Sequence, residues 1–169
     1  MPKQKVKATK LSVGLPFNLG QLEFVEDETQ QRAAWELYVE LTTRIAAQPL
    51  DPDTGILREA FTSLYSVFGI TRDILKRAGP EVARGKNSFG PVAINVLNKG
   101  IRAFLAKWHP LLQAHEENRP AGVSVRDHER AWEQNAECRK ALAEVQRQMT
   151  IYVDVLAKIA GIKADEEDK

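Results

Sequence analysis

The chain has 169 residues, of which 43% are hydrophobic and 28% are charged, a composition typical of a soluble globular protein. Its 24 basic and 23 acidic residues give a net charge of +1, which argues against a protein that coats nucleic acid over its whole surface but allows a local basic patch. No apolar run reaches the ~18 residues of a membrane span, and no apolar segment of signal-peptide length follows the N-terminus. We therefore expect a cytoplasmic protein that does not bind membranes.

The first 25 residues divide into a basic arm and a predicted β-hairpin. Residues 1–10 carry four lysines and few residues to bury, so we expect a flexible arm that is either simply solvated or binds phosphate or an acidic partner. In residues 11–25, hydrophobic residues alternate with small or polar ones on both sides of a segment rich in Pro, Asn and Gly, which predicts the hairpin. Because an isolated hairpin is marginal in water, it must lie on helices or pair with a strand of another copy.

Hydrophobic residues at helical spacing predict a first helix over residues 28–47 and a second over residues 54–78. Asp53 or Thr54 is suited to cap the second helix, because both side chains accept hydrogen bonds from free backbone N–H groups. Gly69 lies inside this helix, where glycine costs about 1 kcal/mol relative to alanine. We expect it to allow the close approach of a neighbouring backbone.

A polar loop over residues 79–88 leads to a third predicted helix over residues 89–115. Pro110 falls inside this helix, where it removes one backbone donor and clashes with the preceding turn. The sequence predicts a kink near Lys107–Pro110, or else a break into two helices.

The stretch from Ser124 to Ile162 contains no proline and only one glycine, Gly161 near its end, and it predicts one long C-terminal helix. Ser124 and Asp127 fit a capping box at its start. Hydrophobic residues repeat every seven positions in two offset series, which is the pattern of a helix packed nearly parallel to its neighbours. The two series are Asn135, Leu142, Met149 and Leu156, and Cys138, Val145, Tyr152 and Ile159.

Short joins make successive helices antiparallel neighbours. The predicted fold is therefore all-α: an up-down-up-down four-helix bundle with a small N-terminal β-hairpin and a long C-terminal helix. Residues 11–162 form the single predicted domain, and residues 163–169 form an acidic tail. The long helix is expected to project past its neighbours near residues 124–135, where Trp132 would be a natural binding anchor.

The third predicted helix carries the residues that most invite a chemical role. Arg102 and His109 are seven residues apart, which places them on one helix face about 10 Å apart. This Arg–six residues–His spacing resembles the catalytic motif of HEPN-domain ribonucleases, which are small helical domains, usually dimeric, that cut RNA without a metal. The resemblance implies that the Arg102 cation would stabilise charge on the phosphorane while His109 moves the proton of a 2′-hydroxyl.

No phosphate-binding glycine loop, metal-binding histidine pair or Ser-His-Asp order is present, so we expect no cofactor and no metal. The sequence favours a non-enzymatic protein-interaction or assembly module of a multi-component system, which binds a protein partner or a second copy of itself. A HEPN-like ribonuclease using Arg102 and His109 is the alternative. A second alternative is a nucleic-acid-binding accessory subunit that uses Lys99, Arg102, Lys107 and the lysine arm of residues 1–10. Asn95, on the same helix, is a further candidate binding residue.

Overall fold

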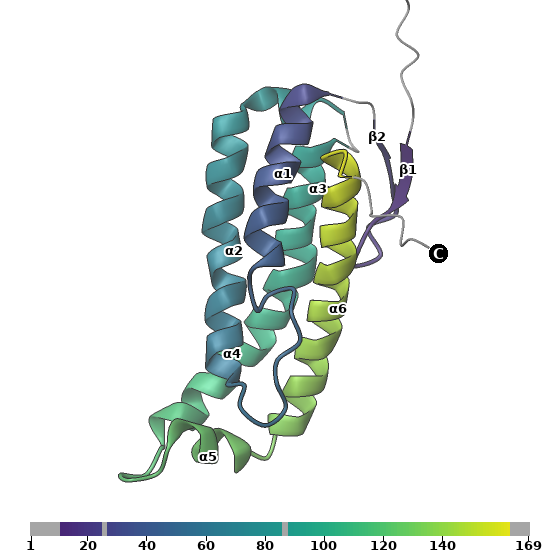
Figure 1. The fold of residues 1–169 in the computed structure, drawn as a ribbon. Helices are drawn as coiled ribbons and strands as arrows, with labels where there is room; N and C mark the ends of the chain where they lie inside the picture. Colours follow the sequence, from purple (N-terminus) through teal and green to yellow (C-terminus); the bar gives the residue numbers. More distant parts are fainter. Residues whose placement is uncertain (1–10, 25–26, 86–87, 163–169) are drawn as a thin grey trace, which may run out of the picture.

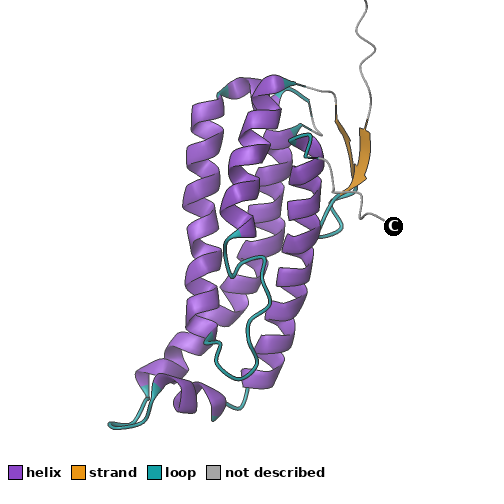
Figure 2. Ribbon diagram, in the orientation of Figure 1, coloured by secondary structure: helices purple, strands orange, loops and turns teal. Residues whose placement is uncertain are grey.

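The computed structural model describes residues 11–24, 27–85 and 88–162, which form a mostly helical protein with one small antiparallel sheet (Figures 1 and 2). The predicted basic arm (residues 1–10) and acidic tail (residues 163–169) lie outside the described residues. The elements in chain order are β1 (Leu11–Gly14), β2 (Gln21–Phe24), α1 (Glu28–Thr42), α2 (Leu57–Ala78), a 3-10 helix (Pro80–Ala83), α3 (Phe89–Asn95), a π-helix (Val96–Ile101), α4 (Arg102–Glu117), α5 (Val125–Arg130) and α6 (Asn135–Ile159).

The hairpin prediction is confirmed. Strands β1 and β2 pair antiparallel, with Val13 opposite Leu22, and both of these side chains are buried in the main hydrophobic core. The loop between the strands places Phe17 in the left-handed region, and the Phe17 N–H donates to the Gln148 side chain of α6 at 2.6 Å. The hairpin therefore lies on the helices, beside α6 (Figure 1).

Helix α1 begins as its sequence suggests, with Asp27 accepting a hydrogen bond from the backbone N–H of Gln30. It ends at Thr42, earlier than the predicted residue 47. The hydroxyls of Thr42 and Thr43 bond to backbone carbonyls one turn earlier, a local alternative to continued helical bonding. The buried Gln146 side chain then donates to two backbone carbonyls of the following turn. These bonds fix a compact connection in place of a last helical turn.

Three predictions for α2 are wrong. The helix begins at Leu57 rather than residue 54, and neither predicted cap is used, because Asp51 instead accepts hydrogen bonds from the backbone of Asp53 and Thr54. The Leu57 N–H donates to the Glu129 carboxylate at 2.8 Å, so a side chain from α5 caps this helix. Gly69 makes no close helix crossing, because a Cβ built there would have no neighbour within 4 Å.

The third predicted helix is helical along its length and contains an irregular turn that the sequence did not predict, while the kink expected near Lys107–Pro110 stays a prediction. The backbone forms a π-helix over Val96–Ile101, whereas Pro110 lies inside the continuous helix α4. The predicted alternative of two helices separated near Pro110 is therefore wrong. Close approaches occur at Gly100, where a Cβ would lie 2.6 Å from the Phe17 ring, and at Gly90, where a Cβ would lie 2.9 Å from the Val82 carbonyl oxygen.

The predicted long C-terminal helix is broken into α5 and α6, although its two ends are as expected. Ser124 and Asp127 form the capping box, and Gly161 has the positive φ of a helix C-terminus. Between them the chain turns at residues 131–134, and α5 lies across one end of the molecule (Figure 1). The turn allows Glu129 to reach both α2 and α6, and it allows Trp132 to pack inward.

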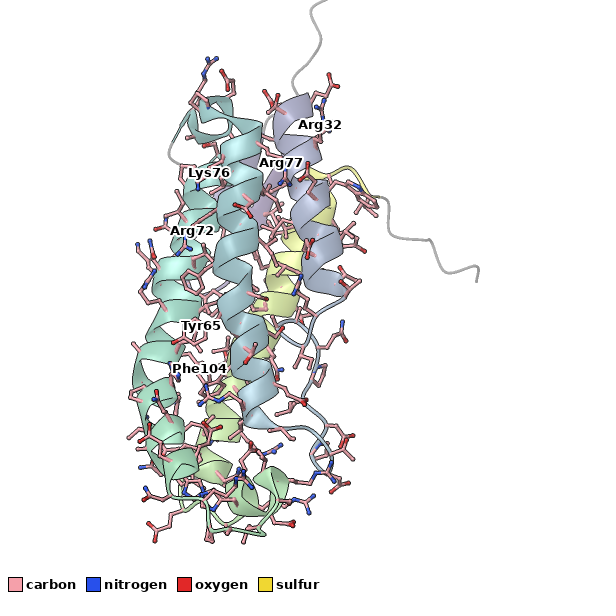
Figure 3. All side chains as sticks on the ribbon, turned by 90° about the vertical axis from the view of Figure 1, so that its left-hand side faces the viewer. Arg32, Tyr65, Arg72, Lys76, Arg77 and Phe104 are labelled. Carbon is pink, nitrogen blue, oxygen red and sulfur yellow. The ribbon has the colours of Figure 1, made fainter. Side chains whose placement is uncertain are left out.

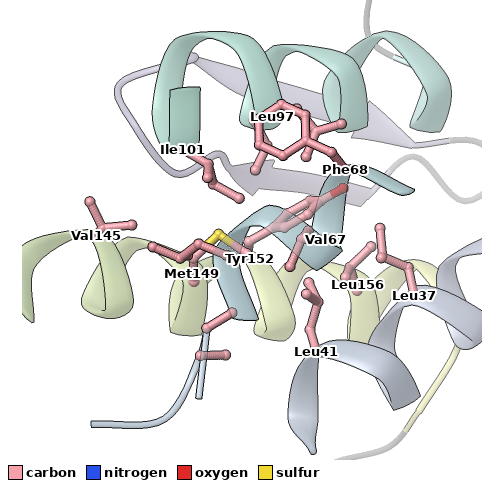
Figure 4. Packing of buried hydrophobic residues seen from close by; sticks show 14 of the residues in the cluster. Leu37, Leu41, Val67, Phe68, Leu97, Ile101, Val145, Met149, Tyr152 and Leu156 are labelled. Carbon is pink, nitrogen blue, oxygen red and sulfur yellow. The ribbon is translucent and has the colours of Figure 1, made fainter. Parts of the chain in front are cut away.

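The predicted hydrophobic seam of α6 is confirmed, since all its hydrophobic members are buried, whereas Asn135 is half-buried. Figure 4 shows side chains from α1, α2, the π-helix and α6 meeting in one cluster. The labelled members are Leu37, Leu41, Val67, Phe68, Leu97, Ile101, Val145, Met149, Tyr152 and Leu156. Burial of such side chains contributes roughly 1.5–3 kcal/mol each, so this cluster is a main source of stability.

Candidate functional site

A groove on the surface between α2 and α4 holds the two residues of the Arg–His motif and the side chains that face them. Arg102 of α4 lies against Phe68 of α2, and His109 of α4 lies against Tyr65 of α2. The two helices therefore run antiparallel here. The groove is lined by Tyr65, Ser66, Phe68, Gly69, Arg72 and Arg102.

Two guanidinium groups converge on one aromatic ring at one end of this groove. The Cζ atom of Arg102 is 5.0 Å from the centroid of the Phe68 ring, and the Cζ atom of Arg72 is 5.8 Å from it. Both arginines are exposed, and Arg102 also donates to the Asn98 side chain at 3.2 Å. Neither arginine forms an ion pair with any carboxylate in the part of the chain that the structure describes.

Other arginines near α2 are neutralised. Arg77, one turn and a half beyond Arg72, is paired with Glu36, and Arg32 is paired with Glu28 at 3.3 Å (Figure 3). Like charges held close together repel each other unless an anion lies between them. The uncompensated pair in the groove is therefore suited to bind an anionic group.

At the other end of the groove, the Tyr65 hydroxyl and the His109 Nδ1 atom form a hydrogen bond of 2.7 Å. The two rings meet edge to face, with centroids 5.2 Å apart. The phenol and the imidazole therefore hold each other in one orientation. Tyr65 is nevertheless 44% exposed, so it remains accessible to a ligand.

The π-helix sets the direction in which Arg102 points. A π turn holds one more residue than an α turn, and one residue corresponds to about 100° of helix rotation. Residues after Ile101 are therefore rotated by about this angle relative to an uninterrupted α-helix. The Phe17 ring of the hairpin loop lies against Gly100 inside the π-helix, where no side chain fits. π-Helical turns occur frequently at functional sites.

The other binding residues predicted on the third helix do not line the groove. Asn95 is half-buried at the end of α3, and Lys99 is exposed on the π-helix. The ammonium of Lys107 lies over the Trp108 ring at 4.4 Å and pairs with Glu137 of α6 at 3.2 Å. Lys107 therefore faces α6 rather than α2.

Trp132 is not on a projecting helical turn, so its predicted position is wrong, while its role as a binding anchor stays a prediction. Its half-buried ring packs edge to face against Trp108, with centroids 6.2 Å apart, and is stacked on His115 at 5.7 Å. The His115 and His128 rings stack at 3.9 Å, and each Nε2 donates to the backbone carbonyl of the other residue at 2.7 Å. This aromatic group fastens α5 to the end of α4.

Three residues of the groove were not predicted from the sequence: Tyr65, Phe68 and Arg72. Phe68 was expected only as a core residue, and the other two were not assigned a role. Their spacing of three and four residues gives one stripe along α2, which could have been recognised. What the stripe faces depends on the antiparallel alignment of α2 with α4, which no local pattern specifies.

Outside the groove, the structure offers few groups suited to catalysis or metal binding. Burial raises the pKa of the Cys138 thiol to about 12, helped by the nearby Glu129 carboxylate, so this thiol is a poor nucleophile. Among the described residues no three His, Cys, Asp or Glu side chains are grouped to hold a metal ion. Within the same residues no helix is long and apolar enough to cross a membrane.

The chain matches no family model, no curated protein and no solved structure. The candidate site therefore rests on the geometry of the α2/α4 groove alone.

Proposed function

We propose that this chain is a four-helix-bundle binding module, without catalytic activity, that holds an anionic partner in the α2/α4 groove as part of a larger assembly. The observation that supports this function is the convergence of Arg72 and Arg102 on the Phe68 ring, where neither forms an ion pair with a carboxylate of the described residues. A guanidinium group beside an aromatic ring can still present its N–H edges to an anion. The two N–H donors of such an edge can bind two oxygens of one phosphate or carboxylate group at once.

The proposal is tested by titrating isotope-labelled protein with inorganic tripolyphosphate and following backbone amide signals by NMR. We expect shifts confined to the groove segments 65–72 and 102–109. The double variant Arg72→Gln/Arg102→Gln should lose these shifts, because the two charges that attract the anion are gone.

The matched control is Arg32→Gln/Arg147→Gln, which removes the same charge from exposed helix positions where each arginine already pairs with a glutamate. This control should respond to tripolyphosphate as the wild type does. Shifts spread evenly over the surface, or equal shifts in the groove variant and the wild type, would contradict the proposed function.

A second function is favoured by one specific contact. The Tyr65 hydroxyl orients the His109 imidazole two helical turns from Arg102 on the same groove, which is an arrangement that metal-independent RNA cleavage could use. That reading predicts cleavage of RNA in the presence of EDTA, abolished by Arg102→Ala and by His109→Ala separately. RNA that stays intact with the wild-type protein, or cleavage unchanged in both variants, removes the ribonuclease alternative.

A further inference from the structure

We propose that the anion held in the α2/α4 groove is the phosphodiester backbone of a single-stranded nucleic acid. One phosphate lies between Arg72 and Arg102, and a base stacks on Tyr65. This inference rests on the proposed function and specifies its ligand. It combines three features of the groove: a pair of cations, an open space above the α2 backbone and an accessible aromatic ring.

The cation end has room for a tetrahedral group. Gly69 lines the groove between Phe68 and Arg72, and a Cβ at this position would have no atom within 4 Å. The space above the α2 backbone is therefore open. A phosphate in this space can accept hydrogen bonds from two guanidinium groups at once, because it presents oxygens in several directions.

The distance along the groove matches a short piece of single strand. Tyr65 and Arg72 are seven residues apart on α2, which corresponds to two turns or about 10 Å. Nucleotides stacked at 3.4 Å each would place about three of them along this length. One strand can therefore present a phosphate to the arginines and a base to the tyrosine.

The aromatic end favours a nucleic acid over an acidic protein segment. Tyr65 is accessible, and its hydrogen bond to His109 holds its ring in place, so a base can stack on it with little further loss of freedom. Proteins that bind single strands commonly combine a basic groove with exposed aromatic rings in this way. An acidic peptide would use the arginines but has no general need for an aromatic surface beside them.

Charge distribution favours a single strand over a duplex. The net charge of the chain is +1, and the arginines farther along α1 and α2 are neutralised by glutamates. Proteins that bind a duplex usually spread a larger basic surface along its two backbones. Within the groove, the two arginines that line it, Arg72 and Arg102, form no ion pair among the described residues, and together they make only a small basic surface.

The test is fluorescence anisotropy with a labelled oligouridylate of about 12 nucleotides, a length within the usual range of single-strand sites. A labelled oligoglutamate peptide of equal charge serves as the competing ligand class. We expect the oligouridylate to bind more tightly than the peptide. Each phosphate that is neutralised contributes about 0.7 to the slope of log affinity against log salt, so Arg72→Gln/Arg102→Gln, which releases one phosphate, should reduce the slope by about 0.7. The control Arg32→Gln/Arg147→Gln should keep the wild-type slope.

A second measurement tests the stacked base. Tyr65→Ala should weaken binding about 5- to 150-fold, because it removes one base–aromatic stack. Tyr65→Phe keeps the ring and loses only the hydroxyl, so its affinity should stay within about twofold of the wild type. Equal losses in both variants would contradict the stacking role.

The experiments distinguish a failure of this inference from a failure of the proposed function on which it rests. Tripolyphosphate shifts at the groove together with tighter binding of the peptide than of the oligouridylate would overturn the nucleic-acid inference and leave an acidic protein partner. Oligouridylate binding with the same affinity in the arginine variant would also overturn the inference, since the strand would then lie elsewhere. If tripolyphosphate causes no shift at the groove, both the function and its proposed ligand fail.

Discussion

Tyr152 offers the sharpest test of the packing of the core. It is 2% exposed, and its hydroxyl lies among side chains of α2 and the π-helix, where it has no hydrogen-bond partner among the described residues (Figure 4). A buried polar group without a partner keeps the full cost of losing its water, about 1–3 kcal/mol. Replacing the hydroxyl by hydrogen removes that cost.

The variant Tyr152→Phe should therefore be more stable than the wild type. The void left by one oxygen atom is smaller than a methyl group, and a methyl-sized void costs about 1 kcal/mol. The net gain expected in the free energy of unfolding is about 1–2 kcal/mol. For a protein of this length, that corresponds to an increase in Tm of about 2–8 °C.

Equilibrium unfolding in urea measures this gain, provided that the m value stays unchanged. The matched control is Tyr65→Phe, which removes an exposed hydroxyl that bonds to His109 and should change stability by no more than about 0.5 kcal/mol. A loss of about 1 kcal/mol or more in Tyr152→Phe would show that the hydroxyl makes a hydrogen bond in solution, and the reasoning would be refuted.

Stability at alkaline pH provides an independent test of the burial of Tyr152. Burial alone raises the pKa of the Tyr152 phenol well above its usual value near 10, so the folded protein keeps this proton while the unfolded chain loses it. The stability contributed by this group is fully present below about pH 10 and is lost as the pH rises further. The difference in free energy of unfolding between Tyr152→Phe and the wild type should therefore grow by about 1.4 kcal/mol from about pH 9 to about pH 11. A constant difference would indicate that the phenol is accessible to solvent.

Three further predictions concern glycine, cysteine and a buried carboxylate. Gly69→Ala should raise the free energy of unfolding by about 1 kcal/mol, since the new methyl group meets no atom. Gly100→Ala should lower the free energy of unfolding, because its Cβ would lie 2.6 Å from an aromatic ring. Urea denaturation that ranks the two variants the other way would contradict both predictions. Native Cys138 should not react with Ellman's reagent at neutral pH and should react fully in guanidinium chloride; rapid labelling of the folded protein would refute its burial. Glu129→Gln should destabilise the protein by about 3 kcal/mol, because it removes a 4% exposed carboxylate that pairs with an arginine and caps α2. Glu144→Gln, at an exposed pair, should have a much smaller effect in the same assay, and equal losses in the two variants would contradict this.

The sequence is sufficient to predict the helices and the side of α6 that is buried. A seven-residue repeat of hydrophobic side chains has few structural solutions, because a helix must cover such a stripe. Cys138, Leu142 and Met149 therefore lie in the core as their spacing requires. The hairpin was also predictable, since the alternation of its strands and the composition of its loop are local features.

The break between α5 and α6 could not be predicted, because the contacts that produce it join distant parts of the chain. Glu129 caps the first turn of α2, 72 residues earlier, and Trp132 packs on the Trp108 ring of α4. Nothing in the sequence from Ser124 to Ile162 interrupts helical propensity. A continuous helix would leave both side chains in water, and their burial against the other helices favours the turn.

In the candidate site, too, local features could be predicted from the sequence, whereas contacts between distant parts of the chain could not. Arg102 and His109 could be paired from their spacing alone, because two residues seven apart on a helix share one face. Arg72 and Tyr65 could not be joined to them, because that requires knowing how α2 aligns with α4. The Arg–His motif therefore identified the face of α4 that meets α2, and α2 supplies the second cation and the aromatic ring.

The hairpin links the fold to the candidate site. Phe17 lies on Gly100 within the π-helix, and its backbone N–H is held by Gln148 of α6. The extra residue of the π turn rotates α4 by about 100°, and in this orientation Arg102 lies against Phe68 of α2 while it also donates to Asn98 of the π-helix. A hairpin that appears peripheral thus supports the segment on which the groove depends. A structural element of only two short strands can persist at such a place because the helices it contacts, rather than its own hydrogen bonds, provide its stability.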